Sequence, residues 1–157
     1  TMNNLTFGNA RTQYYETLGG GAGAGKGFDG ASGVQVHMTN SRLTDAEVLE
    51  TRFPVRVERF GLRLNSGGPG KNRGGDGLHR RLRFLEPMEA SILSSHRLVA
   101  PRGLEGGGDG QAGVNKLTRV DGTEEILKPS DSARMREGDT LTIQTPGGGG
   151  YGKPRSG

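Results

Sequence analysis

The sequence predicts a mainly β protein, a glycine-rich β-sandwich or barrel-like domain with one short helix. Glycine supplies 30 of the 157 residues, far above ordinary usage, so the chain is rich in loops. The apolar residues fall into short alternating runs bounded by turn residues, which is typical of an all-β fold. Helical spacing occurs at about Thr44–Arg52. The length predicts a single domain, which we place at residues 1–152, followed by a polar tail at residues 153–157.

The N-terminal part of the chain combines polar and glycine-rich stretches. Thr1–Ala10 is polar and is expected to form turns, and Tyr14–Leu18 is expected to form a short strand. The glycine-rich loop Gly19–Gly27 follows, and it lacks the Lys-Ser or Lys-Thr pair that ends a phosphate-binding P-loop. Val34–Met38 alternates as a half-buried strand does.

One helix is expected in the middle of the chain. Thr44 and Glu47 have the spacing of a capping box at a helix start. Leu49 and Phe53 share one helical face, and Pro54 ends the helix because the residue before proline avoids the α region.

Two long strands are expected next. Val55–Leu64 reads as one strand whose apolar residues change parity near Gly61, which indicates a β-bulge. Leu78 and Leu82 mark the inward face of the following strand, and Arg80 falls on that same face. An arginine among core-facing positions needs a partner, so Arg80 is either part of a buried ion pair or a ligand contact.

The last third of the chain is predicted as strands and turns: a strand at Ala90–Val99 that contains His96 and Arg97, a hairpin at Leu117–Leu127 that turns at Asp121-Gly122, a turn at Glu137–Asp139, and a strand at Thr140–Thr145. A glycine-rich loop, Pro101–Gly113, separates the first two. We expect the glycines of Thr145–Gly152 to pack against another subunit, with Tyr151 as an anchor.

Ser66–Gly77 is the most distinctive stretch, with six glycines in SGGPGKNRGGDG. Successive bare N–H groups can form a concave anion-binding nest, and Lys and Arg add charged donors. The candidate ligand-binding residues are Gly67, Gly68, Lys71, Arg73, Gly74, Gly75 and Asp76. The alternative is a long hairpin tip without a ligand.

Composition excludes several classes of function. The net charge of +4 is modest, and the one Arg-Gly-Gly triplet lacks neighbouring aromatics, so we expect no nucleic-acid partner. The chain has no cysteine and no apolar run long enough for a membrane span, and a cytoplasmic setting fits. His37, His79 and His96 lack metal-ligand spacing, so we expect no metal on this segment. Thr1 is either a boundary or, if the chain is processed there, an N-terminal nucleophile.

Five motifs occur in a familiar order: YYETLGGGAGAG, HMTNSRLTDAEVLE, SGGPGKNRGGDG, PRGLEGG and TPGGGGYG. With these, nearly the whole chain resembles the C-terminal part of the B-type region of the hydantoinase B/5-oxoprolinase family, and HMTNSRLTDAEVLE resembles the ATP-dependent 5-oxoprolinase branch. In that family T-M-N-N is internal to a longer chain, so we expect Thr1 to be a boundary and not a nucleophile.

The resemblance implies an enzyme that couples ATP hydrolysis to the opening of a cyclic amide. ATP and Mg²⁺ are expected in an A-type region, and a divalent metal in the earlier B-type region, both outside this segment. The expected partners are the rest of the B-type region and an A-type subunit or domain, in an oligomer that acts on a small molecule. This segment would belong to the region that hydrolyses the phosphorylated intermediate, with candidate catalytic residues His37, Asn40, Arg42, Arg73 and Arg80. The alternative is a non-catalytic scaffold or assembly domain, and the isolated segment is expected to be inactive.

Overall fold

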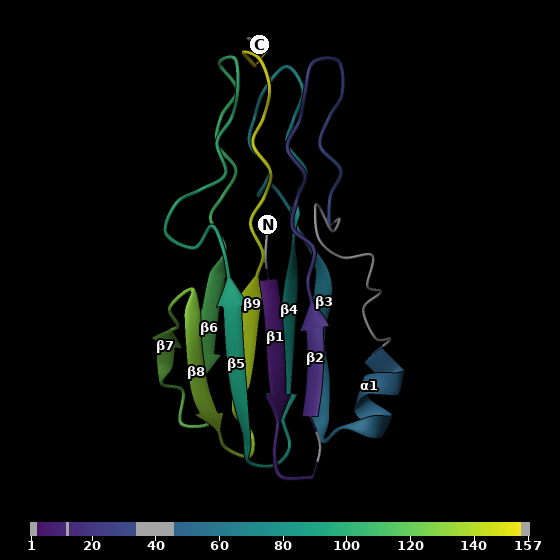
Figure 1. Ribbon diagram of the computed structural model, residues 1–157, viewed down its shortest axis with the longest axis vertical. Coiled ribbons are helices and arrows are strands. Elements are labelled where there is room, and N and C mark those ends of the chain that lie inside the picture. Colours follow the sequence, from purple (N-terminus) through teal and green to yellow (C-terminus); the bar gives the residue numbers. More distant parts are fainter. Residues whose placement is uncertain (1–2, 12, 34–45, 155–157) are drawn as a thin grey trace.

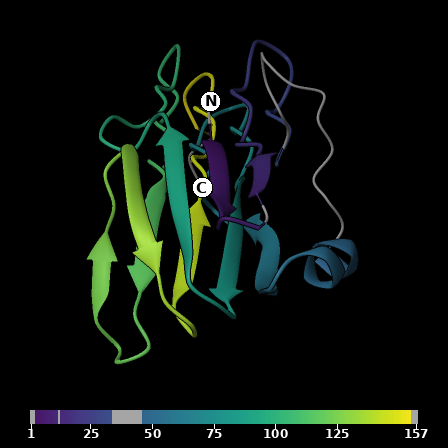
Figure 2. The same cartoon turned by 60° about the horizontal axis from the view of Figure 1, so that its bottom comes forward.

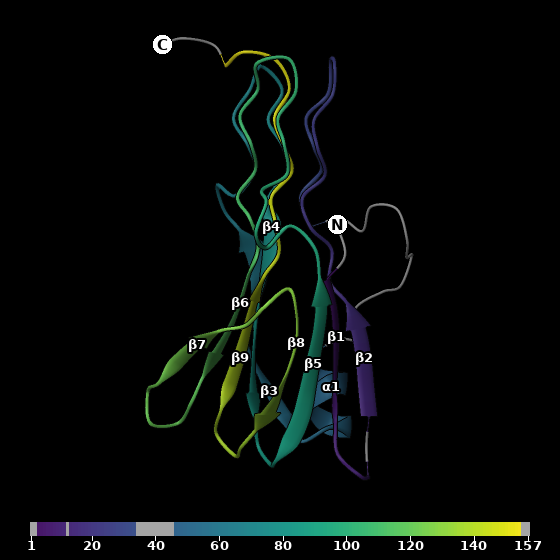
Figure 3. The same ribbon diagram turned by 60° about the vertical axis from the view of Figure 1, so that its left-hand side comes forward.

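The computed structural model describes residues 3–11, 13–33 and 46–154. Within these ranges the strands form two antiparallel sheets that face each other as layers (Figures 1 and 3). The four-stranded sheet has the order β2 (Gln13–Thr17), β1 (Asn3–Gly8), β5 (Met88–Ser94), β8 (Ser130–Met135). The five-stranded sheet has the order β3 (Val55–Arg63), β4 (Gly77–Phe84), β9 (Thr140–Gln144), β6 (Val114–Thr118), β7 (Glu124–Ile126). The predicted β-sandwich is thereby confirmed.

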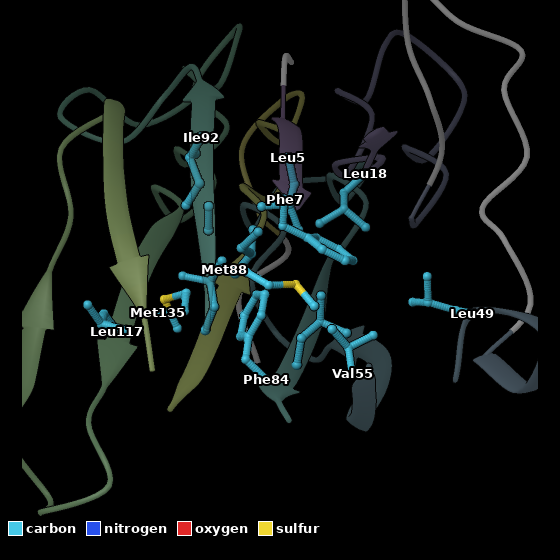
Figure 4. Close-up of a cluster of buried hydrophobic side chains, with 14 residues drawn as sticks. Leu5, Phe7, Leu18, Leu49, Val55, Phe84, Met88, Ile92, Leu117 and Met135 are labelled. Atoms are coloured by element: carbon cyan, nitrogen blue, oxygen red, sulfur yellow. The ribbon is translucent and has the colours of Figure 1, made fainter. Parts of the chain in front are cut away.

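The core lies between the two sheets, where alternate side chains from both layers meet (Figure 4). The buried apolar side chains are Leu5, Phe7, Leu18, Leu49, Val55, Leu82, Phe84, Met88, Ala90, Ile92, Leu117, Met135, Leu141 and Ile143. Phe7 stands edge-on to Phe84, with ring centroids 5.4 Å apart, so the aromatic contact joins the two layers.

The short helix α1 (Ala46–Arg52) lies at the side of the sandwich and packs against β3 (Figures 1 and 2). It agrees with the predicted helix, except that Thr44 of the capping box lies outside the described residues. Leu49 is fully buried, and the carboxylate of Glu50 accepts a hydrogen bond from the backbone N–H of Val57 at 2.8 Å. The helix therefore covers the start of the edge strand β3.

The expectation of turns at Thr1–Ala10 is wrong for its described part. Asn3–Gly8 forms β1, which lies between β2 and β5 in the four-stranded sheet. Leu5 and Phe7 point into the core, whereas Thr6 between them is exposed. The polar residues are the outward half of an alternating strand, and only two inward positions are apolar.

Two further boundaries differ from the prediction. The β-bulge in β3 falls between Val57 and Arg59, with Glu58 as the extra residue, and not near Gly61. β5 ends at Ser94, and the chain then bends through His96, which has a left-handed φ of 53°. His96 and Arg97 consequently lie on a loop rather than on a strand. The strand β8 is not predicted from the sequence, because its outward residues are mostly small and polar.

The glycine-rich loops gather at one end of the sandwich and stand beyond the sheets (Figures 1 and 3). We call residues 19–33, 66–77, 101–113 and 145–152 the glycine bundle. The first three segments are hairpin-like loops, and the fourth is a single extended segment that continues from β9. The bundle brings together the glycine-rich segments of the sequence, including the ligand-binding candidate Ser66–Gly77.

Candidate functional site

Residues 145–152 lie at the centre of the glycine bundle, because they bond to all three loops. The backbone N–H of Ala24 donates to the Gly149 carbonyl at 2.9 Å, and that of Gly68 donates to the Gly148 carbonyl at 2.8 Å. The N–H of Leu104 donates to the Gly150 carbonyl at 2.9 Å. The structure thus gives these glycines neighbours from the same chain. Packing of this segment against another subunit, with Tyr151 as an anchor, stays a prediction.

Glycine is required in the bundle because the backbones touch. A Cβ atom on Gly148 would lie 2.0 Å from the carbonyl oxygen of Ala22, and one on Gly74 would lie 2.0 Å from the carbonyl oxygen of Gly148. Neither neighbour can turn away as a flexible side chain would. The abundance of glycine is thus explained by the packing of backbone on backbone.

The N–H groups of the predicted anion nest are engaged inside the bundle. Gly67 donates to Oδ1 of Asp76 at 2.9 Å, and Gly68 donates to the neighbouring segment described above. Gly74 donates to the Gly68 carbonyl and Gly75 to the Ala22 carbonyl, each at 2.9 Å. These four donors are therefore directed at protein acceptors, and any ligand role of the loop falls to its side chains.

Arg73 is held in place by Asp76. The Nη2 atom of Arg73 lies 3.2 Å from Oδ1 of Asp76, and the Arg73 backbone N–H donates to Oδ1 of Asp29 at 3.0 Å. The Arg73 side chain is 45% exposed, whereas that of Asp76 is 8% exposed. Nε and Nη1 of Arg73 have no hydrogen-bond partner among the described residues. The guanidinium is oriented on one side and open to solvent on the other.

The environment of Asp76 favours its charged form. Burial pushes the pKa of Asp76 upward, but the N–H groups of Gly67 and Asn65 and the charge of Arg73 outweigh burial and hold the pKa below its usual value. Lys71 is exposed, and its backbone N–H donates to the Gly152 carbonyl at 3.2 Å. Arg73 thus presents a cationic side chain beside a carboxylate that stays ionised, and Lys71 adds an exposed cation on the same loop.

The sequence leaves two alternatives for Arg80, a buried ion pair or a ligand contact, and the structure shows a buried ion pair. Its guanidinium contacts the carboxylate of Glu16, and both side chains are 2% exposed. The ring of Phe60 lies over the guanidinium, with 5.2 Å from Arg80 Cζ to the ring centroid. Arg80 is therefore shielded from solvent and connects two sheets, as a structural residue does.

The remaining candidate catalytic residues, His37, Asn40 and Arg42, lie outside the described residues. His79 lies on the outward face of β4, and Nδ1 of His96 lies 3.2 Å from the Val99 carbonyl oxygen. Burial, with a smaller effect of Arg63, lowers the pKa of Arg97 to about 10.

No metal cluster is found within the described ranges, where no three His, Asp or Glu side chains lie together as ligands would. The absence of metal from the whole segment stays a prediction. In the same ranges, no helix is long and apolar enough to cross a membrane.

A shallow hollow of about 750 Å³ lies on the outer face of the four-stranded sheet, and the sequence patterns do not predict it. Its lining includes the side chains of Thr6, Tyr15, Glu89, Ser91 and Arg134. The signal that could identify it is the alternation of polar Thr6 with buried Leu5 and Phe7, which becomes visible only once residues 3–8 are recognised as a strand.

Comparison with known proteins gives consistent matches along the chain. The Hydantoinase B/oxoprolinase family model matches residues 1–154. The sequence is 52% identical to 5-oxoprolinase 1 of Arabidopsis thaliana over 96% of this chain, and 46% identical to 5-oxoprolinase of Dictyostelium discoideum over 99% of it. The chain spans 12% of the length of each of these relatives. The ATP-dependent caprolactamase of Pseudomonas jessenii has a similar fold, with a TM-score of 0.72 and 25% identity over 97% of this chain and 28% of that protein.

Proposed function

This chain belongs to the hydantoinase B/oxoprolinase family, and we therefore propose that it is the C-terminal portion of the B-type region of an ATP-dependent 5-oxoprolinase. The proposed reaction converts 5-oxo-L-proline, ATP and water to L-glutamate, ADP and phosphate. The observation that carries the proposal is the 52% identity with a 5-oxoprolinase over 96% of this chain. Likeness to an ATP-dependent caprolactamase supports the use of ATP.

The rest of the enzyme supplies parts that this segment does not. Because the chain spans 12% of its 5-oxoprolinase relatives, we assign ATP and Mg²⁺ to an A-type region and a divalent metal to the earlier B-type region. The partners of this segment are those two regions, within an oligomer. Its described residues contribute hydrogen-bond donors and positive charge.

Within that enzyme we assign this segment to the hydrolysis of the phosphorylated intermediate. Such an intermediate carries a carboxylate and a phosphate, which need charged donors. Arg73 fits this need because Asp76 orients one side of its guanidinium while the other side remains open. Lys71 adds a second exposed cation, and His37, Asn40 and Arg42 remain further candidates from the same proposal.

The test is a substrate assay of the full-length protein that contains this chain. Purified enzyme is incubated with ATP and either 5-oxo-L-proline, hydantoin or N-methylhydantoin, and ADP and the ring-opened acid are quantified. We expect ADP and L-glutamate in equal amounts with 5-oxo-L-proline. Turnover of a hydantoin, with no turnover of 5-oxo-L-proline, would contradict the proposed substrate and leave the family intact.

The second candidate function is that of a scaffold and assembly domain. It is supported by the bundle, whose loop glycines already use their N–H groups on protein acceptors, and by the buried position of Arg80. Changing Arg73 and Arg80 separately in the full-length enzyme distinguishes the candidates. A scaffold predicts defects in assembly or stability with unchanged kcat/KM per assembled enzyme, whereas a catalytic segment predicts a fall in kcat/KM for Arg73→Lys in a normally assembled enzyme.

A further inference from the structure

The outer face of the five-stranded sheet is strongly basic. The register of the strands places six cations on this face: Arg56, Arg59, Arg63, Arg81, Arg83 and Lys116. Two carboxylates accompany them, Glu58 and Glu124. We call these eight residues, with His79, the basic face. Its surplus of four positive charges equals the formal net charge of the whole chain, +4, so the rest of the chain is electrically balanced.

His79 lies near the centre of the basic face. Its neighbour across the β3–β4 ladder is Gly61, and a Cβ atom on Gly61 would meet nothing within 4 Å. Arg59 and Arg63 flank Gly61 at alternate positions of β3, and Arg81 follows His79 by two residues on β4. The surface beside His79 is therefore open at Gly61, with arginines at the neighbouring positions of both strands.

Burial lowers the pKa of His79, and nearby cations, Arg59 and Arg63 foremost, lower it further. The two nearest cations on β3 are held differently. Nη1 of Arg63 donates to the carbonyls of Ala112 and Thr145, at 2.8 and 3.2 Å, which fixes its guanidinium over the sheet. The Arg59 side chain has no hydrogen bond or ion pair with another described residue.

The carboxylates of the basic face neutralise only part of it. Glu58 contacts both Arg81 and Arg83, with Oε2 of Glu58 3.0 Å from Nε of Arg81. Oε1 of Glu124 lies 3.5 Å from Nζ of Lys116. Arg56 and Arg59 have no such partner within the described part of the chain. Positive charges held on one face repel each other, so the arrangement favours an anionic partner.

The shape and composition of the basic face favour a protein partner over nucleic acid. It is the surface of an antiparallel sheet with no Phe or Tyr pointing outward, so it lacks the stacking platform typical of single-stranded nucleic acid sites. Its two carboxylates would lie against phosphates in a nucleic-acid complex. The outer face of the four-stranded sheet differs in charge, since Glu89 and Arg134 lie opposite each other there and their charges balance.

We propose that the basic face docks against an acidic surface in the remaining part of the longer protein. The relatives are about eight times as long as this chain, which spans 12% of each, so a large protein surface is available to cover it. Complementary charges across such an interface set orientation and disfavour wrong contacts. The proposal uses family membership and does not depend on which cyclic amide is the substrate.

The test is zero-length cross-linking of the full-length protein with a carbodiimide, which joins a lysine amine to a carboxylate in contact with it. Lys116 is the lysine of the basic face, and its product with Glu124 serves as an internal reference. We expect an additional product between Lys116 and an Asp or Glu outside residues 1–157. Arg59→Glu should lower the yield of that product by roughly fivefold or more relative to the reference. Raising NaCl from about 0.05 M to about 0.5 M should lower it in the wild type as well.

Arg134→Glu is the matched control, because Arg134 is exposed on the balanced face and its side chain makes no ion pair with the described residues. Arg134→Glu should leave unchanged the yield of the long-range product, in which Lys116 is joined to an Asp or Glu outside residues 1–157. A wild-type protein that yields only the Lys116–Glu124 product would overturn the proposal, as would a long-range product insensitive to both Arg59→Glu and salt. RNA binding that Arg59→Glu abolishes and Arg134→Glu spares would also overturn it, because nucleic acid would then occupy the face. None of these readouts requires turnover, so they are separate from the test of the proposed reaction.

Discussion

Glu16 on β2 and Arg80 on β4 form an ion pair across the sandwich, with Oε1 of Glu16 2.8 Å from Nε of Arg80. The pair joins the two sheets near the end that carries the glycine bundle. The Tyr14 hydroxyl donates to the same carboxylate at 3.0 Å. Burial raises the pKa of Glu16, and the charge of Arg80 and the Tyr14 hydrogen bond oppose that rise without cancelling it.

Arg80→Met should destabilise the chain by about 3–5 kcal/mol, because it leaves a buried carboxylate without its counter-charge. Loss of Arg80 raises the folded-state pKa of Glu16 further above the unfolded value. The loss of stability is therefore smallest below the pKa that Glu16 has in the unfolded chain, about 4.5. It grows as pH rises toward the pKa that Glu16 has in the folded variant. Urea denaturation at several pH values measures it. The double variant Glu16→Gln/Arg80→Met should lose this pH dependence, and a deficit that stays constant in Arg80→Met would contradict the argument.

Gly148→Ala should destabilise the chain by about 3 kcal/mol or more, because the new Cβ would lie 2.0 Å from a backbone oxygen. Gly61→Ala is the matched control, since the space around Gly61 is open. It should be neutral or stabilising by up to about 1 kcal/mol, as expected for alanine replacing glycine in a strand. Thermal unfolding followed by circular dichroism compares the two, and equal effects would contradict the packing argument.

Arg73→Lys in the full-length enzyme should lower kcat/KM while changing the free energy of unfolding by no more than about 0.5 kcal/mol, as for an ordinary surface change. Lysine keeps the charge near Asp76 but lacks the planar fork that binds a carboxylate or phosphate with two bonds. Steady-state kinetics with 5-oxo-L-proline provide the measurement, and Arg134→Lys is the control. Unchanged kinetics would remove Arg73 from the site.

Asp139→Asn should destabilise the chain by about 2–4 kcal/mol, since a buried carboxylate loses charged hydrogen bonds. Asp139 accepts from Nη1 of Arg119 at 2.7 Å and from the N–H groups of Val120 and Arg136 at 3.1 and 2.8 Å. Burial pushes the pKa of Asp139 up, but these donors outweigh it and hold the pKa below 3.8. Its stabilisation is therefore present above pH 3.8 and is lost as pH falls through the folded pKa.

The control for Asp139 is the neighbouring exposed turn. Asp121→Asn removes a carboxylate that caps the N–H of Thr123 at 2.9 Å in solvent. It should change the urea midpoint much less than Asp139→Asn does. Comparable urea midpoints for the two variants would show that the burial of Asp139 does not cause the loss of stability.

The sequence predicts the strands whose inward positions are strongly apolar. The hairpin at Asp121-Gly122 and the strand at Thr140–Thr145 are confirmed, and Gly122 has the left-handed φ of 92° that its turn needs. β1 is missed because polar residues outnumber its two inward apolar positions. β1 pairs with the nearby β2 on one side and with β5, more than 80 residues away, on the other, and no local pattern contains the second pairing.

The candidate site is predictable in location but not in chemistry. Ser66–Gly77 is a glycine-rich loop as expected, yet its N–H groups bond to residues 22, 76 and 148, whose proximity the sequence does not reveal. The need of Arg80 for a partner is visible in its inward position, and the identity of that partner, Glu16, is not. The basic face is hidden for the same reason, because its six cations come from three strands.

The central position of residues 140–152 has a consequence for how the protein forms during translation. β9 lies between β4 and β6, and residues 145–152 bond to all three loops of the glycine bundle, yet both are made after every segment they join. At about 5–20 residues per second, a ribosome needs on the order of ten seconds to progress from the first loop to this segment. Until it emerges, β4 and β6 lack their shared neighbour and the loops lack their centre. A nascent chain arrested before Thr140 should therefore bind ribosome-associated chaperones and remain sensitive to protease.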